Sequence, residues 1–129
     1  MSETSRTIVE TKNAPGAIGP YSQAVKTSSL VFVSGQLAID PATGELMNGD
    51  IQVETRQAMH NLKNVLEAAG SSLQKVIKTI LVIRDMNNFP VINEVYGEFF
   101  KSDPPARACV EVARLPKDAN VEIEAVGLL

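Results

Sequence analysis

The chain has 129 residues, a formal net charge of −3, one cysteine and one histidine. This length predicts a single domain over residues 1–129, and the acidic balance argues against a nucleic-acid partner, which usually meets a basic surface. One cysteine excludes an internal disulfide, and a single Cys and a single His exclude the usual Cys/His zinc sites.

No apolar run approaches the roughly 20 residues that a membrane-spanning helix needs. Glu3 and Glu10 near the N-terminus argue against a signal or transit peptide. We therefore expect a cytoplasmic protein without a membrane partner, in line with a single unpaired cysteine.

The first part of the chain predicts two short strands around a loop. Residues 4–10 alternate weakly and predict a strand, and residues 22–26 predict a second one. Between them, residues 13–20 contain two prolines and two glycines, which stop a helix or a ladder. Tyr21 follows this loop, either as a packing residue with a solvated hydroxyl or as a lid over a pocket.

Residues 30–37 are β-branched and aromatic and predict the clearest strand. Ser34 and Gly35 interrupt it near its end. Gly35 indicates either a β-bulge or the close approach of a ligand to its amide. Residues 40–44, with one proline and one glycine, predict a turn.

Residues 50–69 predict a helix, with Asp50 as its N-cap and Gly70 just beyond its end. His60 falls outside the apolar stripe and is expected to be solvated. The expected buried stripe consists of Ala58, Leu62, Val65, Leu66 and Ala69.

Residues 76–83 form a near-continuous apolar run, which predicts a central strand covered on both faces. A second helix follows, with a cap from Asn87-Asn88 and Pro90 in its first turn. Asn93 on this helix is either solvated or in polar contact with a ligand or a neighbouring subunit. The expected buried stripe consists of Phe89, Ile92, Tyr96, Phe99 and Phe100.

Residues 104–124 predict two strands joined by a polar turn at residues 115–118. If they pair as a hairpin, Arg107, Cys109 and Glu111 lie near Glu122 and Glu124 on one polar face. The expected buried faces consist of Ala108, Val110 and Val112 in one strand and of Val121, Ile123 and Ala125 in the other. Arg107 then either grips a small carboxylate with its planar fork or makes an ordinary cross-strand pair with a glutamate.

The predicted order is β-β-β-α-β-α-β-β, which indicates an α+β fold: a largely antiparallel six-stranded sheet with two helices on one face. Two helices cover only one face. A central strand that is apolar on both sides therefore predicts that subunit association covers the other face.

Several segments together resemble the Rid (YjgF/YER057c-like) family of reactive intermediate deaminases. They are AIGPYSQA at residues 17–24, SGQ at 34–36, NLKNVLEAAG at 61–70, residues 93–100, PARACVEVARLPKD at 105–118 and EIEA at 122–125. The resemblance implies a chorismate-mutase-like fold, a homotrimer with sites between subunits, and hydrolysis of 2-iminobutanoate or 2-iminopropanoate to 2-oxo acids and ammonia.

The resemblance also assigns roles. Arg107 matches the clamp on the substrate carboxylate, Glu122 matches the carboxylate that orients water, and Cys109 matches a residue that contacts substrate through its backbone. Tyr21, Ser34, Gly35 and Asn93 match pocket residues, and no metal or cofactor is implied; the roles of Glu111 and Glu124 stay open. Relatives described as endoribonucleases that inhibit translation, or as chaperone-like or regulatory binding proteins, give the alternative functions.

Overall fold

The structure is a computed structural model that describes residues 5–129. Its elements follow the predicted order: β1 (Thr7–Val9), β2 (Ala24–Lys26), β3 (Leu30–Gln36), α1 (Ile51–Ala68), β4 (Val76–Ile83), α2 (Phe89–Phe99), β5 (Ala106–Glu111) and β6 (Val121–Leu128). The first predicted strand began at Thr4, which lies outside the described residues. In the part described it is shorter than expected, at three residues.

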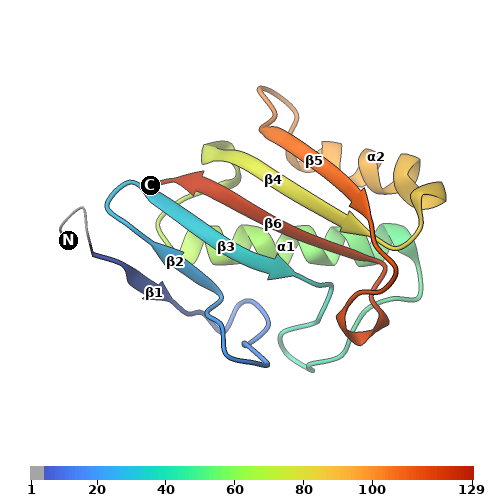
Figure 1. The fold of residues 1–129 in the computed structure, drawn as a ribbon, viewed down its shortest axis with the longest axis horizontal. Helices are drawn as coiled ribbons and strands as arrows, with labels where there is room; N and C mark the ends of the chain where they lie inside the picture. Colours follow the sequence, from blue (N-terminus) through green and yellow to red (C-terminus); the bar gives the residue numbers. More distant parts are fainter. Residues whose placement is uncertain (1–4) are drawn as a thin grey trace.

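The six strands form one sheet in the order β1-β2-β3-β6-β4-β5. All neighbours are antiparallel except β4 and β5, which run parallel. Both helices lie behind the sheet in the view of Figure 1, with α1 crossing β3 and β6. The predicted α+β class and largely antiparallel sheet are confirmed, and we call the two sides of the sheet the helix face and the open face.

The predicted hairpin of the last two strands is wrong. β4 lies between β5 and β6, so β5 is an edge strand with β4 as its neighbour. The reason is topological: β4 reaches β5 through α2, and such a crossover makes the two strands parallel. The residues between β5 and β6 then form a long connection around the end of β4, including a 3₁₀ turn at Pro116–Asp118 (Figure 1).

The parallel pairing also reverses the expected faces of β5. Arg107 pairs with Thr79 and Cys109 with Leu81, and both β4 residues are fully buried under the helices. Arg107 and Cys109 are consequently half-buried on the helix face. The expected core residues Ala108 and Val110 are exposed on the open face, whereas the buried face of β6 is as predicted.

Helix α1 confirms its sequence signals. The Asp50 carboxylate accepts hydrogen bonds from the backbone N–H groups of Gln52 and Val53. Gly70 follows the helix with φ +90°, a conformation that favours glycine. The predicted stripe is buried, and His60 is exposed with its ring edge-on to Phe99. Within residues 5–129, no helix is both long enough and apolar enough to cross a membrane.

Helix α2 begins differently from the prediction. Asn88 makes no side-chain cap, because a 3₁₀ turn at Met86–Asn88 runs directly into the helix. Asp85 caps this turn instead and accepts from the Asn87 N–H. Pro90 lies in the first helical turn as expected, and Ile92 and Tyr96 are buried. The phenylalanines of the predicted stripe pack half-buried against the core.

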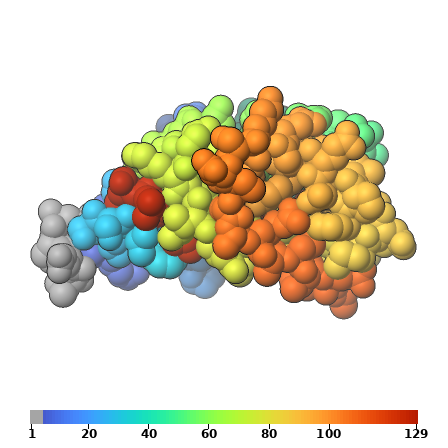
Figure 2. All heavy atoms as spheres, turned by 90° about the horizontal axis from the view of Figure 1, so that it is seen from above, coloured from blue at the N-terminus to red at the C-terminus, as the bar shows by residue number. Residues whose placement is uncertain are grey.

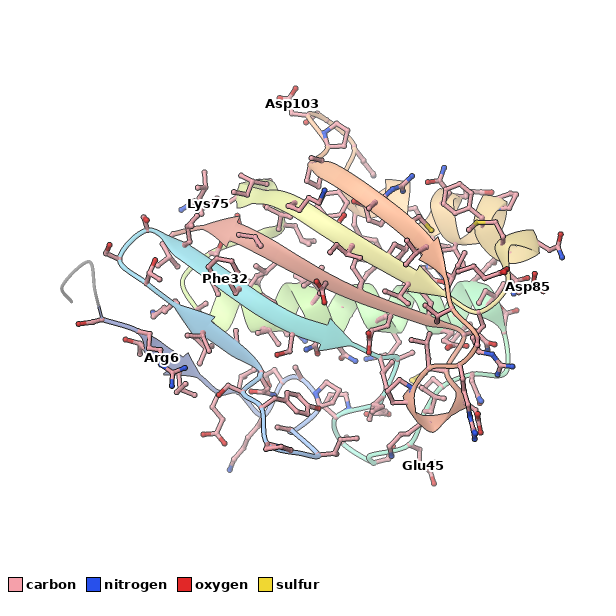
Figure 3. The ribbon with its side chains drawn as sticks, in the orientation of Figure 1. Arg6, Phe32, Glu45, Lys75, Asp85 and Asp103 are labelled. Carbon is pink, nitrogen blue, oxygen red and sulfur yellow. The ribbon has the colours of Figure 1, made fainter. Side chains whose placement is uncertain are left out.

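The main core lies between the helices and the sheet. On the open face, Phe32 keeps 49% and Val110 45% of its accessible surface, and Figure 3 shows Phe32 on the side of the sheet away from the helices. Ile80 and Val82 of β4 are only half-buried there. The sequence predicts that both faces of β4 are covered. Within this chain, the open face of β4 is covered only in part.

Candidate functional site

Arg107 lies on the helix face of the edge strand β5, against α2. Its Nη1 donates a hydrogen bond to Asn93 Oδ1 at 2.7 Å. Its guanidinium carbon lies 4.8 Å from the centre of the Tyr96 ring and 5.4 Å from that of Phe89. No carboxylate of residues 5–129 forms an ion pair with it. An arginine stacked on rings without a carboxylate partner can bind an anion with its remaining donors.

A buried contact between strand and helix supports this arginine. The hydroxyls of Tyr96 and Thr79 share a hydrogen bond of 2.8 Å. Burial raises the pKa of the Tyr96 hydroxyl, and the Thr79 bond and the Arg107 charge lower it in part. The ring beneath the guanidinium is thus tied to β4, the strand that also pairs with Arg107. Figure 2 shows α2 and the β5 segment side by side on this side of the molecule.

Cys109 follows two residues after Arg107 and packs half-buried against the main core. Burial raises the pKa of its thiol, and the nearby Arg107 charge offsets part of that rise. A thiol with a raised pKa is protonated at neutral pH and is a poor nucleophile. The expectation that Cys109 is not activated by a histidine agrees with His60 lying exposed on α1.

A second group of candidate residues surrounds a cavity of about 400 Å³ at the edge of the open face. Four of the predicted site residues line this cavity: Tyr21, Ser34, Gly35 and Glu122. Apolar side chains of the surrounding loops and a few polar ones complete its wall: Pro15, Ile18, Gln23, Gln36, Leu37, Ile39, Pro116 and Glu124.

The Glu122 side chain lies across Gly35, in space that a side chain at this position would occupy. A Cβ atom on Gly35 would be 2.6 Å from Glu122 Cδ and 2.7 Å from Oε1. The predicted bulge is present, since the β3–β6 register shifts between Val33 and Gln36. In the part of the chain described here, the group that approaches Gly35 closely is a carboxylate of the protein itself.

Glu122 is half-buried, and both burial and the negative charge of Glu124 raise its pKa. A carboxyl group with a raised pKa is better suited to take up and return a proton than an ordinary glutamate. Ser34 stands on the same face, but its hydroxyl donates to the Ser22 carbonyl at 2.6 Å. Ser34 thereby joins β3 to the segment that follows Tyr21.

The two groups of residues do not meet within one chain. Arg107 pairs with Thr79, which pairs with Ala125, three residues from Glu122 along β6. The two positions are separated by about 10 Å across the strands and about 10 Å along them. They also face opposite sides of the sheet, because Glu122 pairs with Val82 of the open face. The predicted gathering of Arg107, Cys109 and the carboxylates on one polar face of a single chain is therefore wrong.

Comparison with known protein families shows which family the chain belongs to. The family model described as Endoribonuclease L-PSP matches residues 11–128. The chain belongs to the Rid (YjgF) family. Among curated Rid relatives, a RutC family protein of Pyrococcus horikoshii is 53% identical over 120 residues, which covers 93% of this chain and 95% of that protein.

A human relative named 2-iminobutanoate/2-iminopropanoate deaminase is 45% identical over 128 residues, which covers 99% of this chain and 93% of the human one. Among solved structures, Escherichia coli TdcF with bound serine is 48% identical, with a TM-score of 0.92. That alignment covers 95% of this chain and 98% of TdcF. The Rid fold and the resemblance to deaminases thus rest on matches over nearly the full length.

Several residues of this Rid-family site were not singled out from the sequence for their roles here. Tyr96 and Phe89 were expected only as core, although Tyr96 follows Asn93 by three residues and so shares its helix surface. Gln23 gave no signal beyond its place in a motif.

Glu111 accepts a hydrogen bond from the Met86 N–H at 2.7 Å, which stabilises the turn before α2. Within residues 5–129, no three His, Cys, Asp or Glu side chains gather as metal ligands would.

Proposed function

We propose that this Rid-family protein is an enamine/imine deaminase that hydrolyses small 2-imino acids, such as 2-iminobutanoate and 2-iminopropanoate, to 2-oxo acids and ammonia. The observation that carries the proposal is Arg107, stacked on two rings with no carboxylate partner among the described residues. Relatives named as such deaminases at about 45% identity support it. So does TdcF, whose bound serine carries an α-carboxylate.

Arg107 binds the substrate carboxylate, with Asn93 holding one side of the guanidinium. Glu122 orients a water molecule toward the imine carbon. Water adds to the C=N carbon while Glu122 carries one proton from this water to the nitrogen, which gives a carbinolamine. Glu122 then transfers the remaining hydroxyl proton to the nitrogen as the C–N bond breaks, and ammonia leaves with formation of the C=O bond of the 2-oxo acid. Imines also hydrolyse in free water, so positioning supplies most of the required rate increase. The residues present can perform each of these steps.

The remaining candidates complete the pocket. Tyr21 and Ser34 border the cavity around Glu122, and Gly35 leaves the space that the Glu122 side chain occupies. Cys109 contacts the substrate through its backbone rather than its sulfur. An edge strand such as β5 has backbone groups that its own sheet does not use, which supports this role.

The site is completed between two copies of the chain in a homotrimer. One copy supplies Arg107, Asn93 and Cys109, and its neighbour supplies Tyr21 and Glu122. Two observations support this arrangement: the two groups face opposite sides of the sheet, and the open face carries apolar side chains such as Phe32 and Val110 that a neighbouring copy would cover. Sedimentation equilibrium should give three times the mass of the chain; a monomer at micromolar concentration would contradict the arrangement.

RNA cleavage and translation inhibition form the second candidate function, and the description of the matching family favours it. A nuclease that uses a pair of histidines is disfavoured, because the sequence contains only His60. The net charge of −3 also disfavours a nucleic-acid substrate. A chaperone-like or regulatory binding role would leave Arg107 and Glu122 dispensable.

A coupled assay tests the proposed function. An amino-acid oxidase generates imines from several amino acids, and the loss of imine is followed with and without the protein. We expect the protein to accelerate the loss and Arg107→Ala to abolish the acceleration. Imine loss at the uncatalysed rate with the folded wild-type protein would contradict the proposal, and cleavage of an RNA substrate in parallel would favour the second candidate.

A further inference from the structure

The loop that carries Tyr21 receives little support from packing. Residues 16–21 are all exposed, and the loop stands between two cavities, of about 400 Å³ and about 810 Å³, with Gly16 and Tyr21 in the walls of both. Its own hydrogen bonds are local: the Tyr21 N–H donates to the Gly19 carbonyl at 2.8 Å and the Ile18 N–H to the Tyr21 hydroxyl at 3.4 Å. Within one chain, the position of this loop therefore depends on contacts of the residues that flank it.

Gln23 supplies such contacts. Its side chain is 4% exposed and bonds the backbone on the far side of the loop. Its Oε1 accepts from the Thr11 N–H at 2.7 Å. Its Nε2 lies 2.8 Å from the Pro15 carbonyl oxygen, 3.0 Å from that of Thr11 and 3.3 Å from that of Ala14. One amide thus contacts four backbone groups at the start of the loop, and its two Nε2 hydrogens are shared among the three carbonyl oxygens.

The other end of the loop is held by the sheet. The Ser34 N–H donates to the Gln23 carbonyl at 3.0 Å, and the Ser34 hydroxyl donates to the Ser22 carbonyl. The Gln23 backbone is therefore fixed to β3, while its side chain holds residues 11–15. The two ends of the loop are joined through this single residue.

We propose that Gln23 is a positioning residue of the site: its buried amide closes the loop of residues 15–22 and thereby sets the place of Tyr21 beside Glu122. The inference rests on the proposed function for its link to catalysis and on the hydrogen bonds alone for its effect on the loop. Gln23 touches no reacting atom in this account and acts through Tyr21.

Two variants separate hydrogen bonding from packing. Gln23→Met keeps the length of the side chain and loses all four hydrogen bonds. Gln23→Glu keeps the shape but turns a carboxylate oxygen toward three carbonyl oxygens, which cannot donate to it. We expect both variants to lower kcat/KM by about tenfold or more, because small displacements of positioning groups have effects of this size. Gln52→Met, at an exposed glutamine near the start of α1, should stay near wild type; wild-type kinetics in both Gln23 variants would overturn the proposal.

A double-mutant cycle tests whether Gln23 acts through Tyr21. Tyr21→Ala and Gln23→Met are each measured alone and together on the same imine. Residues that act as a unit are not additive, so the double variant should lose no more kcat/KM than the worse single variant. Losses that multiply would show that Gln23 acts independently of Tyr21 and would overturn the proposal.

Backbone amide hydrogen exchange tests the loop without reference to catalysis. In the full assembled protein, Gln23→Met should accelerate exchange in residues 11–21, including the Thr11 amide, and leave β3, β4 and β6 unchanged. Unchanged exchange in residues 11–21, or uniformly faster exchange over the whole chain, would overturn the positioning role. If the wild-type protein hydrolyses no imine while exchange changes only in the loop, the proposed function fails and the role of Gln23 in fixing Tyr21 stands.

Discussion

The two halves of the candidate site are built in different ways. The arginine half lies on an edge strand and one helix, and its support is a buried hydroxyl pair between Thr79 and Tyr96. The glutamate half lies at the edge of the open face, and its walls come from loops far apart in the sequence. The comparison suggests a division of tasks. In the proposed function, a rigid surface would bind the carboxylate common to all substrates, and a loop-bordered cavity would hold water and the variable part of the substrate.

The arginine half should be the more sensitive to conservative change. Arg107→Lys keeps the positive charge but loses the planar fork and its stacking on Tyr96. A charge-assisted hydrogen bond contributes about 1.5–3 kcal/mol, so kcat/KM on 2-iminobutanoate should fall by about one to two orders of magnitude.

The matched control is Arg56→Lys. Arg56 pairs with Glu98 on the helix surface at 3.0 Å, and exposed pairs of this kind contribute little. Circular dichroism and the oligomer mass should be those of the wild type in both variants. Equal kinetics for Arg107→Lys and wild type would reduce Arg107 to a structural residue and remove the main support for a deaminase.

In the glutamate half, the position of the Glu122 carboxylate depends on the free space beside Gly35, which has no side chain. Gly35→Ala places a methyl group 2.6 Å from Glu122 Cδ, so the carboxylate must move away from its position. We expect kcat/KM to fall by about tenfold with little change in stability, because the displaced atoms are the end of a flexible side chain. Gly49→Ala, where no atom lies within 4 Å of the added methyl, should change neither. Full activity in Gly35→Ala would argue that the position of Glu122 is unimportant.

The acid side of the pH–rate profile should report Glu122. Its pKa is raised by burial and, to a smaller extent, by Glu124, so kcat/KM should fall as the pH drops through this raised value and protonates the carboxylate. Glu124→Gln removes the smaller cause and should move this limb to lower pH. The uncatalysed rate at each pH is subtracted as the control. An acid limb that stays in place would contradict the coupling of the two carboxylates.

The free energy of unfolding should increase over the same pH range in which kcat/KM falls. Because the pKa of Glu122 in the folded protein lies above the ordinary glutamate value of 4.5, folding takes up a proton at pH values between the two. The free energy of unfolding contributed by this group therefore increases as the pH falls through the folded pKa. Urea unfolding at several pH values should show a smaller increase in Glu122→Gln than in the wild-type protein.

Cys109→Ser should have the smallest effect. The thiol has a raised pKa and hydrolysis uses water directly, so kcat/KM should stay within about threefold of wild type. Stability should fall by about 1 kcal/mol, because the hydroxyl is more costly to bury than the thiol. Complete loss of turnover in a folded Cys109→Ser protein would assign the sulfur a chemical role.

Local signals predicted the elements, and non-local pairing limited the rest. Asp50 and Gly70 define the ends of α1 because caps act within a few residues. The position of β4 between β5 and β6 depends on a crossover through α2, which the pattern of either strand does not contain. The apolar Ala108 and Val110 suggested a buried face, yet they lie on the open face, where the chain alone does not cover them.

The candidate site residues show the same contrast between local signals and non-local strand pairing. Most candidates were proposed one by one from short motifs, because each motif keeps its residue types wherever the strand lies in the sheet. Their separation into two halves was not predictable, since it follows from the strand order. The role proposed for Gln23 could not be predicted from the sequence. Its side chain contacts four backbone groups at residues 11–15 only in the folded loop, and such contacts leave no periodic pattern in the sequence.

Subunit mixing tests the shared site most directly. Arg107→Ala and Glu122→Gln are each inactive alone in this account, and they are refolded together in equal amounts with different tags. A cyclic trimer that contains both variants has one position at which an intact Arg107 meets an intact Glu122 of the neighbouring copy, so about a third of the sites in mixed trimers are complete. We predict that the purified mixed trimers recover about this fraction of wild-type kcat, whereas each variant refolded alone stays inactive. Mixed trimers of verified composition without activity would contradict a site built from two copies.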